Sequence, residues 1–492
     1  MTDSLGRSLT RASSRLTPPR TPLASVLVGV LVLVVWTGLL AQVWGRGGLL
    51  AWSLGLGYLM YDVGLQVFTG WQIAKIAAPI AAVPNAPDAA PARDSSQRVS
   101  VAVLIAAHNE AAALPATIAA LLDQTDPPDE IVLADDGSTD GTAAWLDGEF
   151  GLTVEAPVVV NGIRLTVIPL PHGGKATALN AALLVTTADV VLTVDADTVL
   201  DSGALAAVRT AFAADLDLVG VTGVITPVCA PTVGGAVLQY FQTYEYIRNF
   251  LARYAWMRVD CLQLISGAFA GFRREAVATV GGFDAATMVE DYELVARMYR
   301  YAGDHDLRWR FAALGAAQAH TEAPGTVAAF LRQRRRWFGE FLQTHWWYRA
   351  MVGERRYGRL GTLMLPVKTV DTLAPVYGLT ALGLLAYFLI TWRTDVLVPV
   401  AVVVGVKLLV DVVFMLWSVR RYRRWVGDPQ RASALGAAAS VVAGLLTFQV
   451  LLQLGALLGW GAALRGNQRW GRQDRFGIRG GTGNGDSDSA LE

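Results

Sequence analysis

The sequence predicts an α/β domain with a mostly parallel sheet, inserted between hydrophobic helices at both ends of the chain. Between about residues 98 and 325, short β-rich runs alternate with helical patterns, which is typical of a sheet with crossover helices. Long uncharged apolar segments flank this region. Of the 492 residues, 53% are hydrophobic and only 17% are charged, which is too apolar for an ordinary soluble protein. We therefore expect a multi-pass membrane protein with one soluble domain.

The charge balance argues against a general nucleic-acid binder. The 41 basic and 41 acidic residues give a net charge of zero, so no global field would attract a polyanion. Cys229 and Cys261 are the only cysteines, which are too few for a disulfide framework or a cysteine-ligated zinc site. Any phosphate-binding site must therefore be local.

The first part of the chain predicts a basic tail and a membrane hairpin. Residues 1–23 are basic and Ser-rich, and residues 24–44 carry no charge over a length that spans a hydrocarbon core. A second apolar segment follows at about 48–68 with no small-residue cleavage pattern before it. This favours a retained hairpin over residues 24–70 rather than a signal peptide. The basic tail should lie in the cytoplasm of a bacterial-type inner membrane, which puts the soluble domain there too.

A linker leads into the soluble domain. Residues 71–97 are rich in Ala, Pro and Asp, as linkers are. In the domain, residues 98–325, we expect helices near 110–123 and 140–147, and strands in VSVAVLIAA, EIVLADD, RLTVIPL and DVVLTVDAD. Ligands of such sheets bind beyond the carboxyl ends of the strands.

After the domain, residues 326–360 interleave aromatic and basic residues. Their charges are too many to span lipid, so we expect amphipathic helices at the membrane surface. Residues 361–462 predict about three membrane segments, near 363–392, 395–418 and 433–460, with the basic run RRYRRW in a cytoplasmic loop.

Two points of this membrane topology stay open. Lys368, Asp371 and two prolines interrupt the segment at 363–392, so the sequence does not decide whether that segment crosses completely. It therefore leaves open on which side the flexible tail, residues 463–492, lies.

Acidic residues follow three of the predicted strands. They are Glu110 after the first strand, Asp135 and Asp136 after the second, and Asp195 and Asp197 after the fourth. If these strands are parallel, their acidic ends meet at one edge of the sheet. Side chains alternate along an extended chain, so Asp195 and Asp197 should share a face, where two like charges need a cation between them.

The chemistry of these groups indicates the cation. Carboxylate oxygens favour Mg²⁺ or Mn²⁺ over zinc, and Mg²⁺ is usually completed by the phosphates of a substrate, which indicates a diphosphate ligand. The run PHGGKATALN supports this, because its glycines allow close approach and Lys175 begins a helix. We expect His172 to be a solvated loop residue and His108 a packing or turn residue, not ligands.

Two later motifs each have two interpretations. Glu290 and Asp291 stand at the start of an amphipathic helix, as catalytic groups or as ordinary N-terminal charges. The run QRRRW, residues 333–337, forms either a basic face at the membrane or a site that stacks a sugar ring and neutralises phosphate.

Together these motifs resemble a known family. In order, Asp-Asp-Gly-Ser (135–138), Asp-Ala-Asp (195–197), Glu-Asp (290–291) and Gln-x-x-Arg-Trp (333–337) are similar to the signature of processive inverting family 2 glycosyltransferases. These membrane enzymes include cellulose, hyaluronan, chitin-oligosaccharide and poly-N-acetylglucosamine synthases. The resemblance covers about residues 98–340 and implies a GT-A fold, a nucleotide-sugar donor, and a growing polysaccharide or lipid as acceptor.

The resemblance also implies a role for each candidate residue. The catalytic base would be Asp291, with Glu290 beside it. The residues implied in nucleotide-sugar binding are Glu110, Asp135, Asp136, Lys175, Asp195 and Arg336. Asp197 and Asp195 would hold Mg²⁺ or Mn²⁺, and Gln333 and Trp337 would bind the acceptor.

The product is less defined. The run SGAFAGFRREAV is similar to the acceptor-side loop of the poly-N-acetylglucosamine and hyaluronan branch, and Val289 stands where cellulose synthases have Thr. This favours uridine diphosphate N-acetylglucosamine as donor. Two other functions remain open: transfer of a single sugar to a lipid, and a non-catalytic membrane transporter or assembly scaffold. The sequence does not identify partner subunits.

Overall fold

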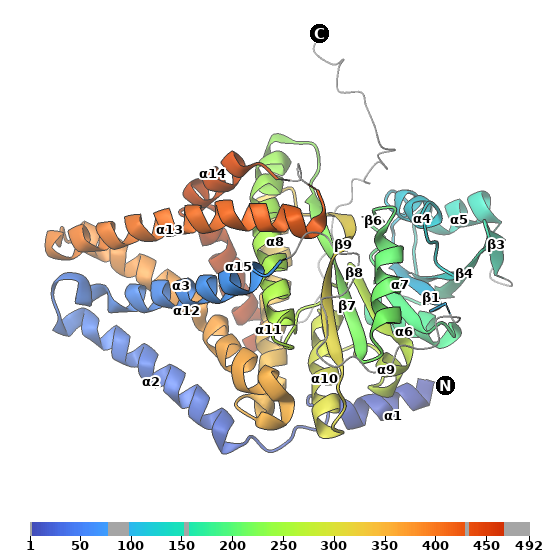
Figure 1. The fold of residues 1–492 in the computed structure, drawn as a ribbon, viewed down its shortest axis with the longest axis horizontal. Coiled ribbons are helices and arrows are strands. Elements are labelled where there is room, and N and C mark those ends of the chain that lie inside the picture. Colours follow the sequence, from blue (N-terminus) through green and yellow to red (C-terminus); the bar gives the residue numbers. More distant parts are fainter. Residues whose placement is uncertain (1, 77–97, 152–156, 429–431, 467–492) are drawn as a thin grey trace, which may run out of the picture.

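The chain forms an α/β part beside a set of long apolar helices (Figure 1). A computed structural model describes residues 2–76, 98–151, 157–428 and 432–466. Most of the expected linker, from residue 77 on, and most of the expected tail, from residue 467 on, lie outside the described residues.

Among the described residues, nine strands form one mixed sheet, in the order β3-β4-β2-β1-β5-β8-β7-β9-β6. The strands are β1 (Val101–Ala107), β2 (Glu130–Asp136), β3 (Val158–Val160), β4 (Ile163–Leu170), β5 (Val190–Val194), β6 (Thr198–Leu200), β7 (Leu218–Val228), β8 (Phe269–Arg273) and β9 (Arg310–Glu322). Strands β4, β2, β1 and β5 are parallel, whereas β8 runs antiparallel to β5 and β7. The four predicted strands thus form the parallel half of the sheet.

Helices cover both faces of this sheet. They are α4 (Leu114–Leu122), α5 (Thr142–Phe150), α6 (Lys175–Val185), α7 (Ala204–Ala214), α8 (Val233–Met257), α9 (Arg274–Thr279) and α10 (Glu290–Asp304). The side chains of β1 alternate between two cores: Val101 and Val103 pack on one face, and Ala102 and Leu104 on the other. The strand is continuously apolar because both of its faces are buried.

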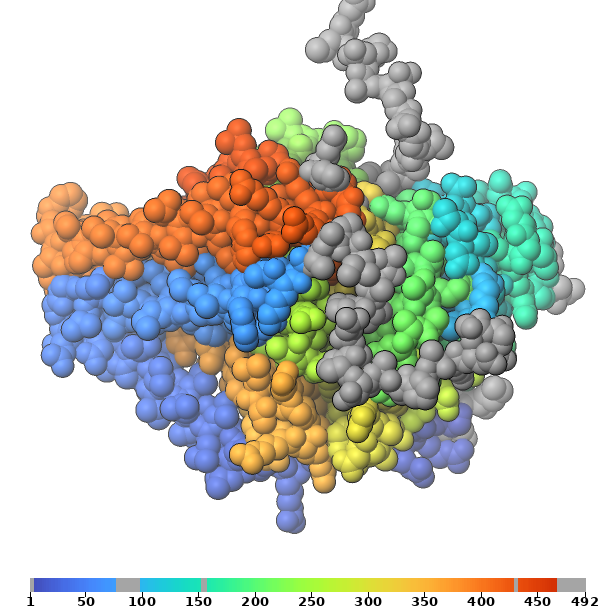
Figure 2. All heavy atoms as spheres, in the orientation of Figure 1, coloured from blue at the N-terminus to red at the C-terminus, as the bar shows by residue number. Residues whose placement is uncertain are grey.

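The N-terminal residues form part of the α/β fold. Helix α1 (Thr2–Ala12) packs against α9 and α10, and Figures 1 and 2 show it beneath these helices. Ala12, the last residue of this helix, and Ser13, which follows it, are buried. The tail expected at residues 1–23 therefore contains a packed helix.

Three helical segments are long and apolar enough to cross a membrane, among the residues that the structure describes. They are α2 (Leu23–Gly45), the segment Leu360–Ile390 and α13 (Thr394–Val426). Helices α14 (Ala434–Gly444) and α15 (Phe448–Leu464) would make a fourth span if the pair, bent by 59°, counts as one. Helix α3 (Ser53–Ile73), the second helix of the expected hairpin, packs against α2 and is not among these three segments.

The remaining helical elements are α11 (Val327–Trp347), η1 (Gly48–Trp52), η2 (Arg349–Met351), η3 (Arg355–Tyr357), η4 (Leu360–Met364) and α12 (Leu365–Ile390). Two expectations for the C-terminal region change. RRYRRW, residues 420–425, lies in the last turns of α13 instead of in a loop, where Arg has good helix propensity and favours the helix C-terminus. The single segment expected at 433–460 is broken between α14 and α15.

Helix α11 packs closely against α15 because glycines lie at the contact. A Cβ at Gly455 would lie 2.6 Å from the Cβ of Arg334, and one at Gly459 would lie 2.7 Å from the carbonyl oxygen of Arg335. Only glycine leaves room for this approach. The helix that carries QRRRW is thereby joined to the last apolar helix.

Candidate active site

A cavity of about 2030 Å³ begins at the sheet and continues between the helices. It is lined by the segments that follow β1, β2 and β5, by α8 and α11, and by polar residues of the apolar helices. The predicted site residues that line it are Glu110, Asp136, Lys175, Asp195, Asp197, Glu290, Asp291, Gln333, Arg336 and Trp337. The structure thus brings together residues that lie far apart in the sequence.

The parallel strands explain the convergence of acidic residues. Strand β1 pairs in parallel with β2 on one side and with β5 on the other. In this register Ala107, the last residue of β1, is opposite Asp135. The prediction that these acidic strand ends meet at one edge is confirmed.

Asp135 and Asp136 have different surroundings. The Asp136 carboxylate is 3% exposed and accepts hydrogen bonds from the backbone N–H groups of Gly173, at 2.7 Å, and Gly174, at 3.0 Å. The Asp135 carboxylate accepts from the N–H of Ser138 at 3.0 Å and does not line the cavity. Asp135 therefore stabilises its own turn, and the expectation that it contacts the nucleotide has no support in this geometry.

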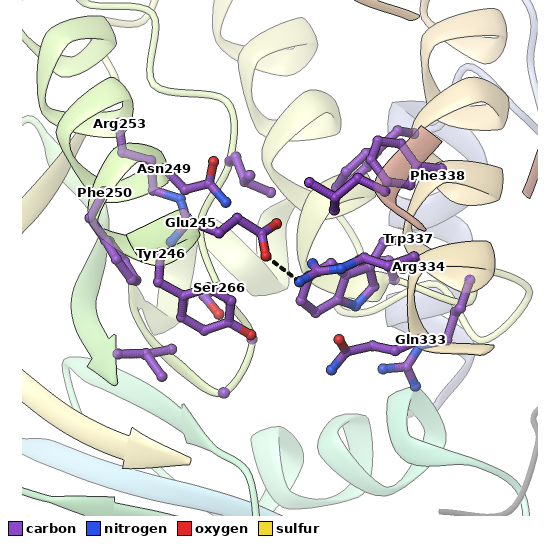
Figure 3. A pocket seen from close by; sticks show the side chains of 18 of the residues that line it. Glu245, Tyr246, Asn249, Phe250, Arg253, Ser266, Gln333, Arg334, Trp337 and Phe338 are labelled. Carbon is purple, nitrogen blue, oxygen red and sulfur yellow. Dashed lines mark hydrogen bonds and ion pairs between the residues drawn. The ribbon is translucent and has the colours of Figure 1, made fainter. Parts of the chain in front are cut away.

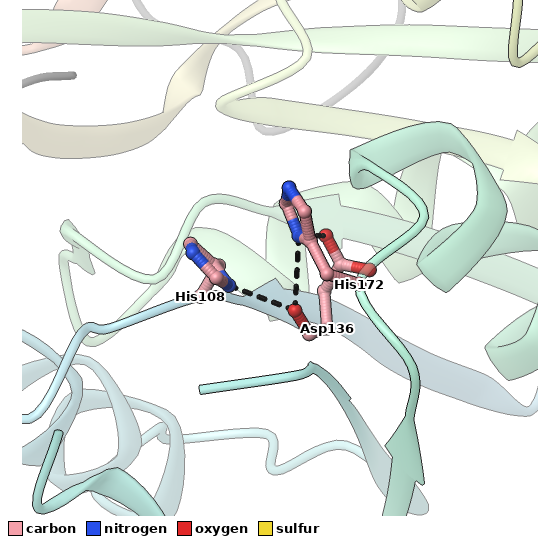
Figure 4. Close-up of side chains that lie close together, drawn as sticks. All are labelled: His108, Asp136 and His172. Carbon is pink, nitrogen blue, oxygen red and sulfur yellow. Dashed lines mark hydrogen bonds and ion pairs between the residues drawn. The ribbon is translucent and has the colours of Figure 1, made fainter. Parts of the chain in front are cut away.

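His108 and His172 flank Asp136 (Figure 4). The Nδ1 atom of His108 lies 2.7 Å from the carbonyl oxygen of Asp136, that of His172 lies 3.2 Å from it, and the ring centroids are 4.3 Å apart. The three side chains are close enough together to hold a metal ion. A carbonyl oxygen only accepts, however, so each Nδ1 carries its proton and is not available to a metal. Both histidines line the cavity, and both are exposed residues outside the helices and strands, as expected of a solvated loop residue at His172 and a packing or turn residue at His108.

Lys175 supplies the positive charge between the acidic residues. It begins α6, as predicted, and its Nζ lies 2.6 Å from Asp195 Oδ1 and 2.9 Å from Glu290 Oε1. Burial lowers the pKa of Lys175, but the carboxylates of Asp195 and then Glu290 outweigh it, so the pKa is raised and the side chain stays charged.

The shared-face argument for Asp195 and Asp197 was wrong. Strand β5 ends at Val194, and both residues lie in a turn closed by a hydrogen bond from the Thr198 N–H to the Asp195 carbonyl oxygen at 3.0 Å. The turn still directs both residues to the cavity.

Asp195 and Asp197 fit a magnesium or manganese ion. Asp197 is 5% exposed, and its Oδ1 lies 3.3 Å from the hydroxyl oxygen of Thr321 and 3.5 Å from that of Thr198. These surroundings offer hard oxygen donors, which Mg²⁺ and Mn²⁺ prefer. Asp195 and Asp197 are therefore the residues that could hold such an ion.

Asp291 is the second residue of α10, which begins at Glu290 as expected. Its carboxylate is buried and accepts hydrogen bonds from the N–H groups of Gly267 and, at 2.8 Å, Tyr292. Burial, and after it the charge of Glu290, raises the pKa of Asp291 to about 6, although Lys175 and both hydrogen bonds act in the opposite direction. A carboxylate with this pKa can accept a proton near neutral pH.

Helix α11 presents Gln333, Arg334 and Trp337 of the QRRRW motif to the other side of the cavity (Figure 3). Gln333 is 8% exposed, and its Oε1 finds no hydrogen-bond partner among the described residues. The guanidinium of Arg334 lies 4.3 Å from the ring centroid of Trp337 and forms a 2.6 Å ion pair with Glu245 of α8. Arg334 is thus buried against α8 rather than spread on a membrane surface.

The sequence interpretation missed the residues that α8 contributes. Glu245, Asn249 and Arg253 line the cavity opposite α11. Burial lowers the pKa of Arg253 to about 10, although the Asp291 carboxylate acts in the opposite direction. The three residues are spaced by four, which places them on one face of a helix, and this periodicity was the signal that could have found them.

The charged residues of the apolar helices pair with one another and also line the cavity. Lys407 Nζ lies 2.6 Å from Asp62 Oδ2 and also pairs with Asp411, and Lys368 Nζ lies 2.6 Å from Asp371 Oδ2. These residues therefore form ion pairs inside the apolar region and at the same time give the cavity a polar lining there.

The mixed sheet, with acidic residues at the ends of its parallel strands, has the GT-A fold of glycosyltransferases. Residues 102–281 match the family model described as "Glycosyl transferase family 2". Residues 102–281 therefore form a glycosyltransferase family 2 domain.

Curated relatives agree with this assignment. A poly-beta-1,6-N-acetyl-D-glucosamine synthase of Staphylococcus epidermidis is 27% identical over 248 residues, which is 50% of this chain and 55% of the relative. The probable glycosyltransferase YdaM of Bacillus subtilis (strain 168) is 27% identical over 253 residues, which is 48% of this chain and 54% of the relative. The chain spans about half the length of the curated relatives it matches.

Among solved structures, the mannosyltransferase PcManGT from Pyrobaculum calidifontis, in complex with GDP-Man and Mn²⁺, is 18% identical to this chain. The similarity covers 87% of this chain and 100% of that chain, with a TM-score of 0.48.

Proposed function

We propose that the protein is an inverting glycosyltransferase of the bacterial inner membrane that extends a β-linked polysaccharide from a nucleotide-diphosphate sugar at its cytoplasmic face. One observation carries this proposal: a single cavity joins Lys175 and Asp291 to the Trp337 helix and continues along the charged residues of the apolar helices. A growing chain has a continuous route in such a cavity. This supports extension and export by one protein.

The chemistry assigned to the chain's own residues is a single displacement. Asp291 takes the proton from an acceptor hydroxyl while that oxygen forms its bond to the anomeric carbon. The bond between that carbon and the diphosphate breaks, and the nucleotide leaves with the electron pair. Lys175 and Arg336 stabilise the charge that develops on the leaving diphosphate. Attack from the opposite face converts an α-linked donor into a β-linked product.

Other groups position the substrates. Gln333 and Trp337 hold the acceptor ring in attack geometry, and Glu110 and Asp136 contact the nucleotide. Asp195 and Asp197 would hold Mg²⁺ or Mn²⁺, which supplies positive charge to the diphosphate when bound. The donor we propose is uridine diphosphate N-acetylglucosamine, which the printed names of the poly-beta-1,6-N-acetyl-D-glucosamine synthase relatives support.

The raised pKa of Asp291 predicts an acidic limit of activity. The ordinary value is 3.8, and in this site it is about 6. A base acts only when it is ionised, so kcat/KM should be constant above about pH 6 and fall as the pH decreases through that value. Initial rates of transfer between pH 4 and pH 8 would measure this. A decrease in kcat/KM centred near pH 4 instead would mean that the ionisation of Asp291 does not control the reaction.

A panel of radiolabelled nucleotide sugars on purified membranes tests the proposed function. We expect incorporation from one donor into a long product that stays at the top of a gel. A product one sugar longer than a lipid acceptor would favour the non-processive alternative. The absence of both transfer and donor hydrolysis with every donor would favour a transporter or scaffold.

A further inference from the structure

The loop that leads into α10 determines where Asp291 lies, and it is fastened at both ends. At its start, Asn180 of α6 donates to the Phe283 carbonyl oxygen at 2.7 Å and accepts from the Phe283 N–H at 2.8 Å. At its end, Glu340 of α11 accepts from the Met288 N–H at 3.1 Å. Residues 285–291 all line the cavity.

Between these points the N-terminal segment holds the loop through Arg15. Its Nε and Nη2 donate to the two carboxylate oxygens of Asp284 at 2.9 and 2.8 Å. The Asp284 side chain is 2% exposed. It also accepts from the Ala286 N–H at 3.0 Å, while its carbonyl oxygen accepts from the Thr287 hydroxyl at 2.8 Å. The two hydrogen bonds from the Arg15 guanidinium therefore fix the orientation of the Asp284 carboxylate, and Asp284 in turn stabilises the turn at residues 284–287.

Helix α1 packs closely against the neighbouring segments, and this packing places Arg15 beside Asp284. Gly281 has φ +93°, and a Cβ there would lie 2.2 Å from the backbone nitrogen of Leu9. At the last residue of α1, one turn further on, Arg300 of α10 donates to the Ala12 carbonyl oxygen at 3.0 Å. Figure 2 shows the dark blue N-terminal residues against the yellow surface that includes α10.

We propose that Arg15 is a positioning residue for Asp291, acting through Asp284, so that the segment before the first apolar helix holds the catalytic loop in its working conformation. This inference rests on the proposed function, because it takes Asp291 as the base. Seven residues separate Arg15 from the start of α2 at Leu23. The same contact therefore ties the first membrane helix to the reaction centre.

Kinetics of the full-length protein in membranes test this role. Arg15→Ala should lower kcat by about 10²-fold, since a displaced reacting group loses that much, and leave the KM for the donor unchanged. Arg15→Lys should restore part of kcat, because it returns the charge but not the two-pronged contact. Arg11→Ala, an exposed arginine of the same segment, is the matched control and should behave as wild type. Equal kcat for Arg15→Ala and Arg11→Ala would overturn the proposal.

Hydrogen exchange tests the same contact without using activity. In Arg15→Ala, the amides of Ala286, Thr287 and Met288 should exchange faster than in the Arg11→Ala control, while those of β1 stay protected. Unchanged exchange at the three amides would refute the positioning role, and so would a general loss of protection. If no donor is used by wild type, the proposed function fails, and the exchange result still decides whether Arg15 holds the loop.

A double variant separates positioning from simple charge burial. Arg15→Ala leaves the buried Asp284 carboxylate unpaired, and Asp284→Asn in the same chain removes that charge. We expect kcat to stay low in the double variant, because neither residue then ties the loop to α1. A return to wild-type kcat would show that only the unpaired charge was harmful.

Discussion

Asp291→Asn is expected to lower sugar transfer by about 10²–10⁴-fold, the range lost with a general base. The asparagine has nearly the same shape, but its single amide oxygen can accept from only one of the Gly267 and Tyr292 N–H groups, and it cannot take the proton of the acceptor hydroxyl. Nucleotide binding should persist, because Lys175 and Asp136 are untouched. Single-turnover transfer of labelled sugar measures the chemical step, and calorimetric titration with the nucleotide measures binding.

The matched control is Asp304→Asn, the same substitution at the exposed far end of α10. It should leave the rate unchanged. Near-normal turnover in Asp291→Asn would remove this residue from the role of base. Loss of nucleotide binding together with turnover would instead indicate that the substitution disturbed the site.

Removal of divalent metal is expected to abolish transfer, and addition of Mg²⁺ or Mn²⁺ to restore it. The ammonium of Lys175 is already shared between Asp195 and Glu290, and the nearly buried Asp197 adds a further negative charge. A diphosphate brings more negative charge into this cavity, so a further cation is needed. Transfer assayed across a titration of chelator measures the effect.

Chelator already saturated with magnesium is the control, and it should not inhibit. Asp197→Asn should raise the concentration of Mg²⁺ needed for half-maximal rate. Undiminished transfer in excess chelator would contradict the metal site.

The parallel half of the sheet and its acidic edge were predictable from the sequence. Alternation of strands and helices is a local property, and once β1, β2 and β5 are parallel, Asp136 and Asp197 must lie at the same edge. The start of α10 at Glu290 and of α6 at Lys175 were predictable for the same reason, because helix starts have local signals.

Contacts between distant segments were not predictable in this way. The sequence raised the question of which cation lies beside Asp195, but nothing local places the Lys175 ammonium there. Arg15 belongs to the basic tail expected at residues 1–23. A tail and a packed helix can have the same local sequence, because they differ only in their tertiary contacts. In both cases the partner is a tertiary contact, which local patterns do not encode.

The glycines between α11 and α15 have a mechanical consequence. No side chain separates the two helices at Gly455 and Gly459, so they are in close contact there and a movement of one is transmitted to the other. A bilayer whose thickness changes the tilt of α15 would therefore shift Trp337 as well.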